Sequence, residues 1–277
     1  MTNLEIDNAY VGSDQVERIY LGADIVWERT QPTPPEPVYS AIPLTFEIIS
    51  GGTISWMRVA GSSNDALTIE YSLDDGDTWT SIKSNIGASA PGINVSAGDK
   101  VQIRGNNRNY FIFMSSTSNR FSSSSGCRFK AYGNIMSLTA YSSFTETNLL
   151  SSANTSVFKN LFYGCSGITT AEHMVFSQNT VSSCYESMFS DCSNLTTGPE
   201  LPADTVANYA YEYMFRNCGN LKHIKCLATN LTGVNCTTNW VSSVSETGTF
   251  VKHPDMISWT TGVSGIPVGW TVQDATV

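Results

Sequence analysis

Charged residues are scarce in this chain of 277 residues, at 14% of the total against roughly 25% in an ordinary globular protein. Acidic residues outnumber basic ones by 24 to 15, which gives a formal net charge of −9. Binding to nucleic acid needs a basic stripe or patch, so this balance argues against nucleic acid as a partner. Ser, Thr, Asn and Gly take the place of charge, which favours exposed β-rich or repeat surfaces.

Long apolar runs are missing as well. No segment approaches the ~20 apolar residues that cross a bilayer, so we expect no membrane insertion. The first seven residues, Met-Thr-Asn-Leu-Glu-Ile-Asp, lack the basic and apolar regions of a secretory signal peptide. We therefore expect synthesis and assembly in a host cytoplasm, unless a leader has been removed.

Motifs of catalysis and metal binding are also absent. The chain contains no Gly-x-Ser-x-Gly elbow, no His-Glu-x-x-His and no phosphate loop. We therefore expect a protein that is not an enzyme and that carries no cofactor and no metal. A carboxylate pair for glycoside hydrolysis stays open, because sequence does not give the separation of two carboxylates. The acidic residues concerned, which we interpret first as solvated, are Glu172, Glu186, Glu200 and Glu212.

The cysteines number seven, and an odd count without a leader argues against a disulfide framework. No Cys-x-x-Cys pair or Cys/His ligand spacing is present. We interpret the cysteines as small buried apolar residues, with a metal or disulfide site as the weaker alternative. They are Cys127, Cys165, Cys184, Cys192, Cys218, Cys226 and Cys236.

One phrase occurs three times in the C-terminal half, over residues 161–168, 188–195 and 214–221. Its cysteines, Cys165, Cys192 and Cys218, are 27 and 26 positions apart. A fixed period in the twenties indicates a solenoid, in which each coil covers the apolar face of its neighbour. The predicted repeat core consists of Phe162, Cys165, Met188, Phe189, Cys192, Met214, Phe215 and Cys218.

Each repeat also has an aromatic residue four positions before its Phe, namely Phe158, Tyr185 and Tyr211. This spacing predicts a short helix with one apolar stripe. A tight turn and a short strand should follow, because Gly198, Pro199 and Pro202 prevent the helix from continuing.

Residues 184–203 match the phrase Cys-Tyr-x-x-Met-Phe-x-x-Cys-x-x-Leu-x-x-x-Pro-x-Leu-Pro-Ala. This phrase resembles the BspA-like subclass of leucine-rich repeats, which is common in surface and phage proteins of gut Bacteroidales and of some protists. The repeats that begin at Phe158 and Tyr211 depart from it, as capping turns do. The resemblance implies a short leucine-rich-repeat solenoid over residues 135–277, closed by the aromatic residues of its C-terminal tail.

Residues 1–30 predict a small β unit, because short β-prone stretches alternate with glycines. Its phrase Val-x-x-Ile-Tyr-Leu-Gly-x-x-x-Val-Trp resembles the N-terminal tag of phage appendage proteins, which implies docking to other virion proteins. A hairpin packed on the rest of the chain is the alternative. The implied docking residues are Ile19, Tyr20, Leu21, Val26 and Trp27.

Residues 31–39 are rich in proline and predict a semi-rigid linker.

Residues 40–134 predict an antiparallel β-sandwich, because short strands alternate with turn signals about every ten residues. Residues 114–126, which are rich in Ser, predict a mobile loop. The expected strands cover residues 44–50, 53–59, 67–72, 78–82, 93–96, 100–104, 110–114 and 127–132.

The stretch from Ser72 to Trp79 matches the Asp-box pattern Ser-x-Asp-x-Gly-x-Thr-Trp, which recurs in sialidase-like propellers. A propeller needs several such blades, and the chain has one box, so we predict a local hairpin staple. A calcium loop formed by Asp74, Asp75 and Asp77 is the alternative, although no Glu follows at EF-hand spacing.

Together these features predict a mainly β fold with short helices and a non-enzymatic role. We expect a phage virion appendage, a fibre or decoration protein of head or tail, exposed on the virion exterior and adhering to a host glycan or surface protein. A homotrimer stays open, although no heptad repeat is present to specify one. The alternatives are a bacterial cell-surface adhesin that lacks its leader and a glycan-cleaving enzyme with an Asp-box.

Overall fold

The computed structural model describes residues 38–58, 66–106, 119–141, 144, 150 and 155–276, together with the backbone of four short strands near the N-terminus. The chain divides into two compact units, Met1–Pro37 and Val38–Val277. In the first unit, β1 (Tyr10–Val11) pairs antiparallel with β2 (Asp14–Gln15), and β3 (Arg18–Leu21) pairs antiparallel with β4 (Asp24–Glu28). The side chains predicted to dock, on Ile19, Tyr20, Leu21, Val26 and Trp27, and linker residues 31–37 lie outside the described part of the chain.

The second unit is organised by a sheet of eleven strands. Its centre is β13 (Arg128–Asn134), which pairs antiparallel with one neighbour, β5, and parallel with the other, β14. The antiparallel part also contains β5 (Leu44–Ser50), β11 (Lys100–Arg104), β7 (Thr68–Ser72) and β8 (Thr80–Lys83). The parallel part contains β14 (Ile168–Thr170), β15 (Met174–Val175), β16 (Thr197–Leu201), β17 (His223–Cys226), β18 (Thr249–Lys252) and β19 (Thr271–Asp274).

A second sheet of four strands lies in the N-terminal part of this unit. Its central strand is β6 (Gly52–Arg58), which pairs with β9 (Asn85–Ile86), β10 (Gly92–Val95) and β12 (Asn119–Ser123). The two sheets meet through aromatic rings, since Phe46 of β5 lies 5.0 Å from Phe121 of β12, centroid to centroid. Strand β12 lies inside the predicted mobile loop 114–126, so that prediction is wrong there. Only Phe121 is apolar in β12, and it is fully buried, which is why the serine-rich sequence concealed the strand.

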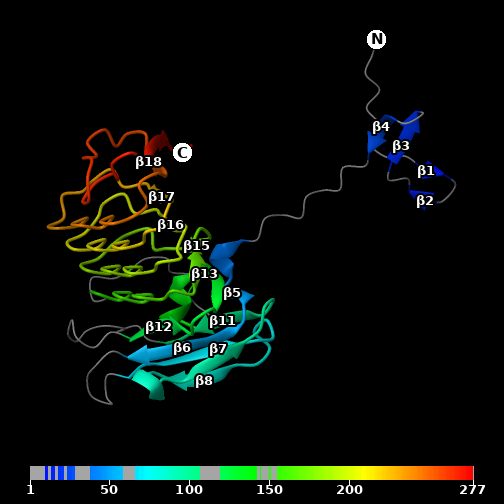
Figure 1. Cartoon of the computed structure of the whole chain (residues 1–277), viewed down its shortest axis with the longest axis horizontal. Helices are drawn as coiled ribbons and strands as arrows, with labels where there is room; N and C mark the ends of the chain where they lie inside the picture. Colours follow the sequence, from blue (N-terminus) through cyan, green and yellow to red (C-terminus); the bar gives the residue numbers. More distant parts are fainter. Residues whose placement is uncertain are drawn as a thin grey trace, which may run out of the picture. The chain divides into compact units, whose positions relative to one another are not determined.

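Helix is almost absent from the described residues. Three short 3-10 segments occur, at η1 (Tyr39–Ala41), η3 (Gly87–Ser89) and η4 (Ile135–Leu138). The prediction of a mainly β fold with a solenoid is confirmed, because the chain forms a β-solenoid of about seven turns. Figure 1 shows the coils stacked above one another, with the parallel strands β16, β17 and β18 along one side.

The short helix predicted in each repeat is wrong. Residues 181–191 form a ribbon of successive turns, with positive φ at every fourth residue, 57° at Ser183, 55° at Ser187 and 63° at Asp191. Every second backbone N–H closes a turn within the coil; the N–H of Met188, for example, donates to the carbonyl of Tyr185 at 3.1 Å. The N–H groups between them donate to the next coil, as the N–H of Phe189 does to the carbonyl of Met214 at 2.9 Å. Half of the backbone N–H groups therefore bond to a neighbouring coil. In an α-helix these groups would bond within the helix, to the carbonyl four residues earlier.

Candidate functional site

The predicted repeat core occupies the solenoid interior. Phe162 stacks on Phe189 with ring centroids 5.5 Å apart, and Phe189 stacks on Phe215 at 5.6 Å, with rings parallel to within 7°. A second column runs from Phe158 through Tyr185 to Tyr211. All eight predicted core residues have no exposed surface, so they hold the coils together and do not contact a ligand.

The repeated cysteines make a bond that the sequence did not reveal. Cys192 donates from Sγ to the Phe162 carbonyl at 3.0 Å, and Cys218 does the same to Phe189 at 3.0 Å. Burial raises the pKa of Cys184, Cys218 and Cys226 to about 12. No cluster of three His, Cys, Asp or Glu suited to a metal occurs among the described residues. The cysteines are free, and the geometry gives them a packing role.

The outer face of the large sheet is polar. Side chains that point inward, such as Ile224 and Phe250, are fully buried, whereas the alternate positions remain half-buried or exposed. The strand register aligns these outward positions from coil to coil, so that a polar row crosses the parallel strands. The row consists of Lys130, Thr170, Thr197, His223, Thr249 and Thr271.

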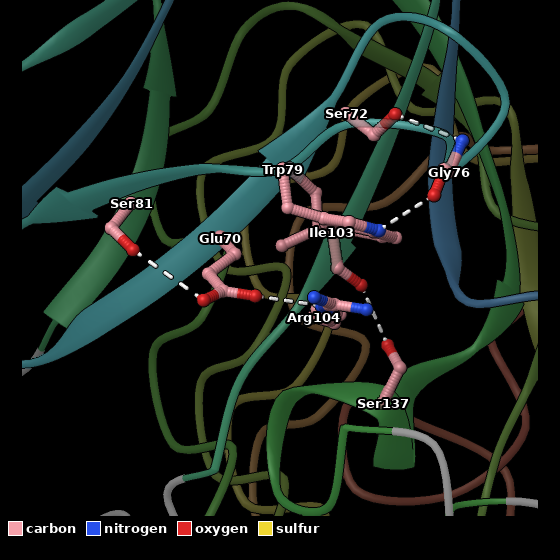
Figure 2. A network of polar contacts seen from close by, with 8 residues as sticks. All are labelled: Glu70, Ser72, Gly76, Trp79, Ser81, Ile103, Arg104 and Ser137. Atoms are coloured by element: carbon pink, nitrogen blue, oxygen red, sulfur yellow. Dashed lines mark hydrogen bonds and ion pairs between the residues drawn. The ribbon is translucent and has the colours of Figure 1, made fainter.

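The Asp-box forms a self-contained turn between β7 and β8. Asp74 accepts hydrogen bonds from the Ser72 hydroxyl at 2.6 Å and from the Thr78 N–H at 2.9 Å, and these bonds lower the pKa of Asp74 to about 2. Trp79 donates from Nε1 to the Gly76 carbonyl at 2.8 Å, and Gly76 has a φ of 95°. Figure 2 shows Ser72, Gly76 and Trp79 bonded within the turn. The box therefore acts as a staple in this hairpin.

Arg104, which the sequence did not single out, covers the indole of Trp79. Its guanidinium carbon lies 3.8 Å from the Trp79 ring centroid, and its Nε lies 2.7 Å from Oε2 of Glu70. Figure 2 shows Glu70 between Arg104 and Ser81, whose hydroxyl donates to the other carboxylate oxygen at 3.4 Å. The cation–π and ionic contacts fix both partners, so this indole face is occupied by the chain's own side chain.

A cavity of about 240 Å³ opens beside η1, along the strands β15 and β16 of the parallel part of the sheet. One wall is aromatic, because Tyr39 stacks on His173 with centroids 4.5 Å apart and planes within 3°. The edge of Tyr132 supports Tyr39 at 5.6 Å. The other lining residues are Glu172, Met174, Val175, Phe176, Gln178, Glu200 and Pro202.

The polar groups of this cavity differ in how they are engaged. Lys225 holds Glu200, with Nζ 2.7 Å from Oε2. The side chains of Glu172 and Gln178 make no hydrogen bond to another described residue and are exposed. The sequence predicts solvated carboxylates at Glu172 and Glu200 and a linker that extends to Tyr39, whereas the structure places Tyr39 in η1. These three residues line one cavity because of the register between strands far apart in the chain, which the local sequence does not encode.

The four acidic residues singled out from the sequence fall into two groups. Glu172 and Glu200 line the cavity, whereas Glu186 lies on the turn ribbon and pairs with Lys159 at 2.6 Å. Burial, with help from the charge of Glu186, raises the pKa of Glu212.

No family model, curated protein or solved structure matches the chain. Among the described residues, no helix is long and apolar enough to cross a membrane.

Proposed function

We propose that the protein is a non-enzymatic phage virion appendage, a fibre or decoration protein whose solenoid presents an adhesion surface to a host glycan or surface protein. The observation that supports this proposal most strongly is the in-register interior. Phe162, Phe189 and Phe215 form one continuous stack, so the coils move together and the outer sheet face is a rigid surface.

Rigidity of this kind suits adhesion. Backbone hydrogen bonds join the coils on the turn side, as from Phe189 to Met214, and on the strand side, as from Leu227 to Leu201. A preorganised surface loses little entropy on binding, and many copies on one particle multiply weak contacts by avidity.

The finer fold assignment belongs to the same proposal. We interpret the coils as BspA-like leucine-rich repeats, the two sheets of residues 40–134 as a β-sandwich, and residues 1–30 as a docking unit that faces other virion proteins. The Asp-box is interpreted as structural because both oxygens of Asp74 accept bonds from within its own turn.

Purified particles provide the first test. We expect the chain to be found in washed virions by mass spectrometry and to be labelled on their exterior by an antibody. The chain should also sediment with host cells, and this binding should fall when surface glycans are stripped or surface proteins are shaved. Absence from particles would contradict the appendage role, and sugar release from host polysaccharides would favour a glycan-cleaving enzyme.

A further inference from the structure

We propose that the cavity beside Tyr39 is a subsite for one neutral pyranose unit of a host polysaccharide, and that it excludes anionic sugars. This inference rests on the proposed adhesion function and assigns its ligand class. Three of its lining residues, Glu172, His173 and Gln178, are exposed to solvent, so a polymer can reach the cavity from outside.

The aromatic wall supplies the apolar contact that a pyranose needs. A sugar ring presents C–H groups on one face and hydroxyls around its edge, so it binds where an aromatic plane meets polar side chains. Tyr39 and His173 are parallel to within 3° and form a double layer, braced by Tyr132. A braced wall is already in place before the ligand arrives, which lowers the entropic cost of binding.

The polar edge is complementary to sugar hydroxyls. The carboxylate of Glu172 accepts hydrogen bonds, and the amide of Gln178 both donates and accepts them. Neither side chain bonds to another described residue, so each is available to a ligand. Glu200 is positioned by Lys225 at 2.7 Å and can still accept from a hydroxyl at its free lone pairs.

The charge of the cavity determines which sugars can enter. Its lining includes two carboxylates and no Lys or Arg, and only Glu200 is neutralised by a nearby cation. A uronate, a sialic acid or a sulfate would therefore lie beside the unpaired Glu172 carboxylate. Like charges at such close range are destabilising, and the whole chain adds to the repulsion with its net charge of −9.

The size of the cavity limits what it holds. Its volume of about 240 Å³ is below the roughly 300–1,000 Å³ of sites for drug-sized ligands. One monosaccharide unit is therefore the appropriate occupant, and the rest of the polymer must lie along the open sheet face. A single shallow subsite implies weak binding by each copy, which agrees with a surface that relies on avidity.

The test uses the full chain in affinity gel electrophoresis, with neutral mannan, dextran and galactan in one set of gels and alginate and heparin in the other. We expect retardation by at least one neutral polymer and none by the anionic ones. His173→Ala and Gln178→Ala should weaken the neutral interaction by about tenfold. Glu172→Gln should weaken neutral binding less than His173→Ala does, because the amide keeps one acceptor oxygen, and it should reduce the exclusion of alginate.

Two control variants lie outside the cavity. Tyr141→Ala removes an exposed aromatic ring near Arg104, and Glu246→Gln removes a distant exposed carboxylate. Both should bind as the unaltered chain does, and thermal unfolding should show that every variant is folded.

The outcomes separate the site from the function. Neutral binding that survives both His173→Ala and Gln178→Ala would overturn the subsite and leave glycan adhesion in place. Preferential retardation by alginate or heparin would overturn the ligand class. A chain that sediments with host cells, binds none of the polymers and loses its binding when surface proteins are shaved would overturn the subsite and assign adhesion to a protein receptor.

Discussion

The thiol of Cys218 lies 3.0 Å from the carbonyl oxygen of Phe189, one coil earlier. The same carbonyl also accepts the N–H of Cys192 at 3.1 Å, within its own coil. Cys192 repeats this relationship with Phe162. The repeat position therefore requires a small, largely apolar side chain with a weak donor that points along the solenoid axis, and cysteine meets all three requirements.

Replacing Cys218 by Ala should lower the free energy of unfolding by about 1–2 kcal/mol, since it removes one buried contact and one weak hydrogen bond while the carbonyl keeps its backbone partner. Urea denaturation measures the change. Cys127→Ala is the control, because Cys127 also has no exposed surface and makes no thiol hydrogen bond to a described residue. Equal losses at both positions would contradict a contribution from the inter-coil bond.

Alkaline pH should destabilise the protein. The folded pKa of Cys184, Cys218 and Cys226 is raised to about 12 from 9.0 by burial. Their stabilising contribution is complete below pH 9 and is lost as pH rises from 9 to 12, because the unfolded thiols ionise first. Between pH 9 and 12, each of these thiols lowers the free energy of unfolding by up to about 1.4 kcal/mol per pH unit. Urea midpoints measured from pH 8 to 11 should fall steadily, and constant midpoints would contradict the burial of these thiols.

Phe189 is the central ring of its column, between Phe162 and Phe215. Phe189→Ala should lower the free energy of unfolding by about 3–5 kcal/mol. The coils cannot close the void left by the missing ring without breaking their inter-coil hydrogen bonds. Phe189→Leu should cost less. Tyr141→Ala, at an exposed ring, should change stability by under about 1 kcal/mol. A small effect of Phe189→Ala in urea denaturation would show that the column does not hold the coils together.

Sequence periodicity predicted the solenoid, because Phe, Cys and Met return at a fixed interval. It did not predict the local conformation. Tyr185 and Phe189 are four positions apart, which matches one face of a helix, but the turn ribbon also repeats every four residues, as the positive φ values of Ser183 and Ser187 show. The two conformations present the same stripe, and the choice between them is made by hydrogen bonds to the next coil, which the local sequence cannot reveal.

The β-rich part was predicted best where alternation is strong. The strands expected at residues 44–50 and 100–104 have the same bounds as β5 and β11. The cavity could not be predicted in this way, because it needs Tyr39, His173 and Glu200 from three distant segments. The Asp-box, whose bonds span four residues, is local and was identified directly.

Asp74 accepts hydrogen bonds that close the Asp-box turn, so Asp74→Asn should destabilise the hairpin. One carboxylate oxygen becomes an amide donor, and it must face a donor of Ser72 or Thr78. At pH 7 the Tm of Asp74→Asn should be lower than the Tm of Asp77→Asn, which alters an exposed carboxylate of the same turn. Calcium and EDTA should leave the Tm of the unaltered chain unchanged, and a calcium-dependent rise would contradict the staple and favour a metal loop.

The pH dependence of this difference follows from the lowered pKa of Asp74, about 2 in the fold against 3.8 in the unfolded chain, caused first by the bond from Ser72 and then by those from Thr78. A carboxylate with a lowered pKa stabilises the fold above pH 3.8, and this contribution disappears as pH falls through about 2. The Tm difference between the unaltered chain and Asp74→Asn should therefore be constant from pH 7 to 5 and shrink between pH 4 and 2. A difference that persists undiminished at pH 2 would mean that the substitution acts through steric disturbance and not through the loss of a charged acceptor.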